Sequence, residues 1–270
     1  MSLGIVIKGP EGLVLAAESR VTIGAQLQDG QQVHVNFDNA TKLLSFGEPN
    51  KAVGVVTYGL AAIGLMTAHS FVPEFEAGLP EERLAVEDFA EHLSDFFMER
   101  WKAAMPPEFE GPSMTFVVGG FDKEEPYGKV FLFEIPQNPA PHGQHQGPGE
   151  FGITWGGQRE FVDRLIRGYD DRLVQIAQQT LDLQPSQVQS LRQSLDVLQM
   201  RIPLPAMPLQ DCVDLAIFFV RTAISAQRLT VGIRGCGGPI DVATITRQDG
   251  LQFVQRKVIV GEAGVLTPPA

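Results

Sequence analysis

The sequence has very few cysteines. Only Cys212 and Cys236 occur among 270 residues, which excludes a disulfide framework, and their spacing matches no metal-ligand pattern. This usage suits a reducing compartment, so we expect a cytoplasmic protein. His142 and His145 lie close together without a third candidate ligand near them, which favours a solvated loop over a metal site. The sequence indicates no cofactor.

Basic residues and long apolar runs are also scarce. The chain carries 21 Lys and Arg against 32 Asp and Glu, a net charge of −11. A nucleic-acid binder needs a basic face that displaces counterions, so this composition argues against a nucleic-acid partner. No run reaches the ~18 apolar residues of a membrane-spanning helix. The first residues lack the basic and long apolar regions of a signal peptide, so we expect neither a leader nor a membrane partner.

The rest of the composition is that of a globular protein, 44% apolar and 20% charged. Short apolar runs bounded by turn residues predict strands at 3–7, 13–17, 33–37, 42–46, 52–58, 113–119, 129–135, 151–155 and 240–246. We expect the first two to pair as a hairpin, the next two to form a second pair, and 113–119 to pair with 129–135.

Apolar residues at helical spacing predict helices at 63–75, 86–97 and 211–227, and a further helix from about Gln158. The Gln-rich stretch 173–198 is also helical in pattern, with a break at Pro185. The segment 136–149 is rich in Pro, Gly and Gln, which predicts a mobile loop. Because strands and helices come in separate blocks, the order favours a layered α+β domain over a βαβ array.

Four segments, in order along the chain, resemble the mature β-subunit of the proteasome. They are the opening segment from Ser2 to Thr22, Thr41-Lys42-Leu43, Tyr58-Gly59-Leu60-Ala61-Ala62, and Cys236-Gly237-Gly238-Pro239-Ile240-Asp241-Val242. The resemblance implies an α+β fold, the four-layer αββα sandwich of the N-terminal-nucleophile (Ntn) hydrolases. It also implies a single domain over 2–250, with a helical insertion at about 173–208 and a C-terminal extension at 251–270.

The chemistry of an N-terminal serine can be argued separately. A hydroxyl is a poor nucleophile until a base removes its proton. A free α-amine has a pKa of about 7.7–8.0 and is partly neutral at pH 7, so an N-terminal residue carries its own base. Ser2 would gain that amine if Met1 were removed. Ser2 and Glu18 also have the spacing of nucleophile and acid in the family.

The resemblance gives roles to three further residues. Glu18 and Lys42 would form a buried ion pair beside Ser2, in which the lysine charge lowers the pKa values of the amine and the hydroxyl. The backbone N–H of Gly59 would lie where a tetrahedral oxyanion forms, and such donors contribute about 2.7–4 kcal/mol. The predicted catalytic residues are therefore Ser2, Glu18, Lys42 and Gly59.

The sequence departs from the family at the groups that tune the amine. A serine is common near the start of the later helix, where this chain has Trp155-Gly156-Gly157. In the late motif, Cys236 replaces a serine and Ile233 replaces an aspartate. These tuning groups are therefore absent or supplied from elsewhere in the fold.

These features favour a proteasome-like peptidase that cleaves peptide bonds of peptides or unfolded proteins through an acyl-enzyme on Ser2. Two alternatives stay open: a non-catalytic scaffold subunit of the same fold, and an Ntn amidase or transpeptidase with a narrow substrate. The family implies a homo-oligomeric ring or spiral. The sequence contains no Walker-type phosphate loop, so any ATPase that works with it would be a separate chain.

Overall fold

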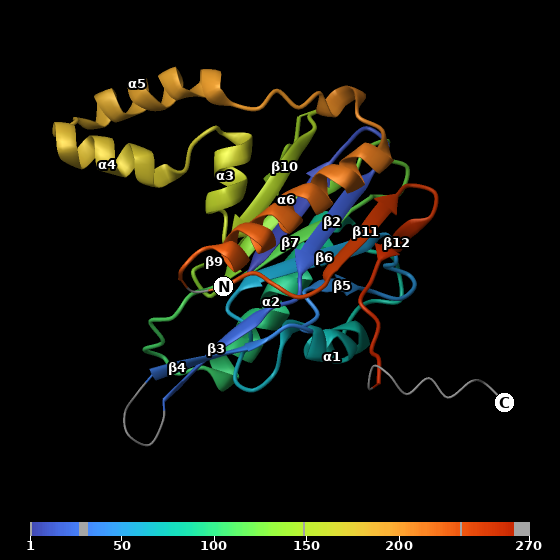
Figure 1. Ribbon diagram of the computed structural model, residues 1–270. Coiled ribbons are helices and arrows are strands. Elements are labelled where there is room, and N and C mark those ends of the chain that lie inside the picture. Colours follow the sequence, from blue (N-terminus) through green and yellow to red (C-terminus); the bar gives the residue numbers. More distant parts are fainter. Residues whose placement is uncertain (1, 27–31, 148, 233, 262–270) are drawn as a thin grey trace.

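The computed structural model describes residues 2–26, 32–147, 149–232 and 234–261 (Figure 1). Two antiparallel sheets lie face to face, and helices cover the outer face of each sheet. Three apolar cores follow from this order, one between the sheets and one beneath each helical layer. The expected four-layer αββα sandwich is confirmed.

The first sheet has the strand order β10-β1-β2-β11-β12. Its strands are β10 (Gly152–Gly157), β1 (Leu3–Lys8), β2 (Leu13–Glu18), β11 (Ile240–Thr246) and β12 (Gly250–Gln255). Every residue of β1 and β2 is buried, because both faces of the sheet are covered. β12 pairs with β11, so this sheet continues beyond residue 250, where the sequence suggested that an extension begins.

The second sheet has the order β5-β6-β7-β8-β9. Its strands are β5 (Leu43–Ser45), β6 (Val53–Gly59), β7 (Met114–Gly120), β8 (Lys129–Ile135) and β9 (Asn138–Gln144). The prediction of a loop at 136–149 was wrong, since β9 lies within it. β9 is an edge strand that pairs only with β8, and an edge strand tolerates prolines such as Pro139 and Pro141.

The predicted pairing of 33–37 with 42–46 was also wrong. β4 (Gln32–Phe37) pairs with β3 (Val21–Gln26) in a separate two-stranded ribbon, and β5 pairs with β6. The backbone N–H of Ala40 donates to the carbonyl of Ser19 at 2.9 Å. After β4 the chain therefore returns to the start of β3, which closes the ribbon. Lys42 follows this return and directly precedes β5 of the second sheet.

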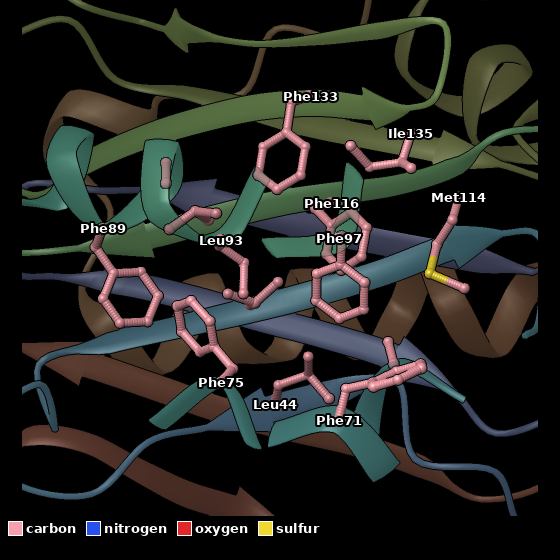
Figure 2. Close-up of a cluster of buried hydrophobic side chains, with 14 of the residues drawn as sticks. Leu44, Phe71, Phe75, Phe89, Leu93, Phe97, Met114, Phe116, Phe133 and Ile135 are labelled. Atoms are coloured by element: carbon pink, nitrogen blue, oxygen red, sulfur yellow. The ribbon is translucent and has the colours of Figure 1, made fainter. Parts of the chain in front are cut away.

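The helical layer on the second sheet contains η1 (Ala68–Phe71), α1 (Val72–Ala77) and α2 (Val86–Ala104). Figure 2 shows the phenylalanine-rich core beneath it, which includes Phe75 and Phe89. The rings of these two residues meet edge to face, with their centroids 5.4 Å apart. α2 confirms the helical spacing of its apolar residues. The helix expected from residue 63 begins only at Ala68, because Ile63 and Met66 form an isolated β-bridge instead.

The layer on the first sheet contains α3 (Glu160–Ile166) and α6 (Leu209–Leu229). Between them, α4 (Asp171–Leu181) and α5 (Pro185–Leu195) form a helical hairpin that projects from the body (Figure 1), followed by η2 (Asp196–Leu198) and η3 (Leu204–Ala206). No helix in the described part of the chain is both long and apolar enough to span a bilayer.

Gly4 sets how the sheets cross at one end of the sandwich. A Cβ added to Gly4 would lie 2.5 Å from Val56 and 2.8 Å from Tyr58, so the start of β1 lies directly on the end of β6. Any larger residue at position 4 would push the strands apart. This contact brings Ser2, which directly precedes β1, to the end of β6 that contains Gly59.

Candidate active site

Ser2 lines a small cavity at the end of β6. It is 5% exposed, and its carbonyl accepts a hydrogen bond from the backbone N–H of Gln158 at 2.6 Å. Lys42, Thr57 and Ala61 line the same cavity. Ser2 is therefore buried, held through its own backbone, and open on one side to a space lined mainly by small residues.

The carboxylate of Glu18, at the end of β2, has four donors. Its Oε1 accepts from the N–H of Leu3 at 3.2 Å and from the ammonium of Lys42. Its Oε2 accepts from the N–H groups of Arg20 at 2.7 Å and Gly237 at 2.9 Å. A fully buried carboxylate needs partners of this kind. Glu18 consequently fixes the residue after Ser2, the start of β3 and the turn before β11 relative to one another.

Lys42 reaches this carboxylate from the other sheet. Its own carbonyl accepts from the N–H of Thr57 on β6 at 2.8 Å, and its ammonium donates to Glu18 and to the carbonyl of Arg20. Burial lowers the pKa of Lys42 below its ordinary value, and the pairing with Glu18 opposes this effect in part. The result is a buried lysine beside Ser2 that loses its proton more readily than an exposed one.

Gly59 ends β6 in a conformation that only glycine adopts without strain. Its φ is +87°, and an added Cβ would lie 2.2 Å from the carbonyl oxygen of Ser113. The next N–H, of Leu60, donates to that same carbonyl at 2.9 Å. Tyr58 and Leu60, on either side of Gly59, both line the Ser2 cavity. The backbone of Gly59 thus passes the edge of the cavity.

Arg20, which follows the end of β2, forms a salt bridge with Asp38. Its guanidinium binds both oxygens of Asp38, at 2.5 and 2.7 Å, and donates to the carbonyl of Arg234 at 3.3 Å. The hydrogen bonds from Arg20 hold the pKa of Asp38 below its usual range. An added Cβ on Gly237 would lie 2.4 Å from the guanidinium carbon of Arg20, so the Gly-rich turn lies directly against this arginine.

Two glutamines that the sequence did not single out connect this turn to Ser2. The side-chain oxygen of Gln227, on α6, accepts from the N–H of Cys236 at 2.8 Å, and its amide nitrogen donates to the side chain of Gln158 at 2.7 Å. Gln158 in turn holds the carbonyl of Ser2. The available signal was that Gln227 is a polar residue at a buried helical position, two turns after Val220 and one turn after Ala223.

The structure explains one departure from the family pattern. Gly157 has a φ of +88°, and an added Cβ would lie 1.9 Å from the carbonyl oxygen of Ser2. No serine fits at this point of β10. Cys236, which stands where the family has a serine, is buried. Burial, together with the nearby charge of Glu18, raises the pKa of its thiol, so Cys236 is a neutral turn residue. Ile233 lies outside the described residues.

Sequence comparisons return no relatives. No model of a known protein family matches the chain, and no curated protein matches it significantly. Solved structures do match. A Gly-1 mutant of Anbu from Hyphomicrobium sp. strain MC1 has a TM-score of 0.56 at 16% identity, covering 95% of this chain and 86% of that chain. The Anbu complex from Pseudomonas aeruginosa, solved as a helical assembly, has a TM-score of 0.57 at 15% identity, covering 97% and 88%.

The chain shares the four-layer αββα fold with these Anbu structures. Within this fold, the structure brings Ser2, Glu18 and Lys42 together and places Gly59 at the edge of the same cavity. Among the described residues, no three His, Cys, Asp or Glu side chains gather in a way that could hold a metal ion.

Proposed function

We propose that this protein is a proteasome-like Ntn hydrolase that cleaves peptide bonds through Ser2. The observation that supports this best is the carboxylate of Glu18, which binds Lys42 and the N–H of the residue after Ser2 at the same time. A carboxylate and a lysine are thereby held beside a buried serine at the start of the first strand.

In the proposed reaction, removal of Met1 frees the α-amine of Ser2, and this amine takes the hydroxyl proton. The oxygen then attacks the peptide carbonyl, and the N–H of Gly59 stabilises the oxyanion. The ammonium returns its proton to the leaving amine, which departs and leaves an acyl-enzyme. Water, deprotonated by the same amine, releases the product.

Lys42 and the glutamines set the conditions for this transfer. The positive charge of Lys42 lowers the pKa of the nearby amine and hydroxyl, and Glu18 holds Lys42 in place. The backbone N–H of Gln158 holds the carbonyl of Ser2, and Gln227 holds the side chain of Gln158.

Assembly is part of the proposal. The chain is proposed to form a homo-oligomeric ring or spiral, which would limit access of folded proteins to Ser2. This is supported by the fold and by the helical assembly named for the Anbu complex from Pseudomonas aeruginosa. Peptides or unfolded proteins are the proposed substrates, and a separate ATPase remains a prediction from the family resemblance.

A non-catalytic scaffold is the second candidate. It is favoured by Gly157 and Cys236, which leave the site without two hydroxyl groups common in the family. In that case the pair of Glu18 and Lys42 would serve only to join the sheets.

The deciding experiment combines intact mass, N-terminal sequencing and hydrolysis of fluorogenic peptides. We expect a chain that begins at Ser2 and hydrolyses peptides, and no turnover for Ser2→Ala. Ser190→Ala, on the exposed helix α5, is the matched control and should match the wild type. A chain that begins at Ser2 but hydrolyses no peptide supports the scaffold.

A further inference from the structure

A second cavity lies beside the Ser2 cavity. Thr41 lines both cavities, and His69, which lines the second, directly follows Ala68, which lines the first. The opposite wall is the segment 256–260, which follows β12 and runs past α1 in Figure 1. The cavity has a volume of about 360 Å³, in the range of ligand pockets. A peptide held at Ser2 can therefore extend a group into it.

The charged groups of the second cavity are positive. Among the described residues its lining contains Arg256 and Lys257 and no carboxylate. Lys257 is already neutralised, because its ammonium and its backbone N–H both bind the carboxylate of Asp241. Arg256 has no ion pair within the described chain, and its guanidinium lies 4.4 Å from the ring centroid of Phe253. Stacking holds the guanidinium without using its in-plane N–H donors.

The other lining groups are neutral or polar. The pKa of His69 lies below its ordinary value, first through partial desolvation and then through the positive charges of Arg256 and Lys257. Asn39 and Thr41 add an amide and a hydroxyl to the lining. Arg256 is exposed, and its guanidinium is held against Phe253 without a carboxylate partner among the described residues. Such a group beside neutral hydrogen-bonding side chains is complementary to a carboxylate, which an arginine binds through two parallel hydrogen bonds.

We infer that this cavity is a subsite for a carboxylate of the peptide, supplied by an Asp or Glu side chain or by a free C-terminus. The inference rests on the proposed function, because the peptide must be held at Ser2. The protein carries a net charge of −11, so acidic peptides are repelled by the molecule as a whole. A local basic cavity is what would allow such a peptide to bind. Exposed Val258 and Ile259 offer apolar contacts beside the arginine.

Binding to the Ser2→Ala variant tests the subsite without turnover. Labelled peptides that differ only by Glu or Gln at one position, or by a free or amidated C-terminus, are compared by fluorescence anisotropy. We expect the carboxylate form to bind about tenfold more tightly in one of the two series, which identifies the source of the carboxylate. Arg256→Met should abolish this preference, and Arg247→Met, at an exposed position outside the cavity, should keep it.

Three results would overturn the subsite: peptides that bind without a carboxylate preference, a preference that survives in Arg256→Met, or no peptide binding at all. Circular dichroism checks that each variant is folded. Failure of the proposed function is a separate result, in which wild-type protein that begins at Ser2 hydrolyses none of the peptides. The binding series still decides the subsite in that case, because it requires no turnover.

Discussion

Glu18 and Lys42 form a buried ion pair between the two sheets. Glu18 ends β2 in the first sheet, and Lys42 directly precedes β5 in the second. Their side chains are 0% and 7% exposed. The pair therefore joins the sheets at the same end of the sandwich where Gly4 packs on Val56 and Tyr58, and where Ser2 lies.

Lys42→Ala is expected to lower both stability and turnover. Removing one partner of a buried pair typically costs about 3–5 kcal/mol, because the other charge is left unpaired. The loss should be greatest at high pH, where Glu18 resists protonation. Lys42→Arg should recover stability more than turnover, since the guanidinium is longer and planar. Thermal midpoints and turnover of both variants at pH 6 and pH 8.5 check this, and full turnover in both would exclude Lys42 from the site.

Gly59→Ala is expected to destabilise the fold and abolish turnover. Alanine would adopt a positive φ at a cost of about 1–3 kcal/mol, and its Cβ would also collide with the backbone at Ser113. Gly78→Ala is the control, because Gly78 has a φ of −92° and only ordinary contacts around an added Cβ. Chemical denaturation measures both variants. Equal stability of the two would contradict the geometry given for Gly59.

Gln227→Leu is expected to cost about 1–3 kcal/mol, because the N–H of Cys236 and the side-chain oxygen of Gln158 each lose a buried partner. Turnover should fall as well, since Gln158 positions Ser2. Gln210→Leu, at the exposed start of the same helix, should change neither. Unfolding free energies and kcat of the two variants are compared. A variant that is destabilised but fully active would show that Gln227 is purely structural.

Lys8 gives a pH-dependent prediction. It is 5% exposed, its ammonium donates to the carbonyl of His145 at 2.6 Å, and burial lowers its pKa. Between this lowered pKa and the ordinary value of 10.5, the unfolded chain binds more protons than the folded chain, so Lys8 makes stability rise with pH.

Lys8→Met removes that contribution. The unfolding free energy of the wild type minus that of Lys8→Met should therefore increase as pH rises toward 10.5. The slope of this difference is at most about 1.4 kcal/mol per pH unit. Below the folded-state pKa the difference should be constant. Urea unfolding from pH 7 to pH 10 measures it, and a wild type that loses stability relative to Lys8→Met over that range would contradict the sign.

The proposed assembly predicts a particle larger than one chain of 29.5 kDa. Exposed apolar residues on the projecting hairpin, including Leu173, Ile176 and Leu181, are available to contact another copy. Light scattering coupled to size exclusion gives the mass. A monomer at all micromolar concentrations would refute the oligomer.

The sequence by itself determined the elements whose pattern is local. Continuous apolar runs around a Gly-Pro turn predicted β1 and β2, and apolar residues at helical spacing predicted α2 and α6. The motifs containing Ser2, Glu18, Lys42 and Gly59 also indicated the fold and the candidate site. The strand and helix patterns depend on neighbours within a few residues, so they can be read from sequence order alone. The motifs indicated fold and site only through their resemblance to a known family.

Only the tertiary structure decided which segments pair and which polar residues meet. β4 pairs with β3 rather than with the segment after it, because Ser19 and Ala40 bring the chain back on itself. β9 is a strand because β8 offers it an open edge. Gln227, Gln158 and Cys236 lie far apart in the sequence, and Arg256 comes near the Ser2 cavity only after β12 has paired. Such contacts depend on long-range packing, for which this sequence carries no local signal.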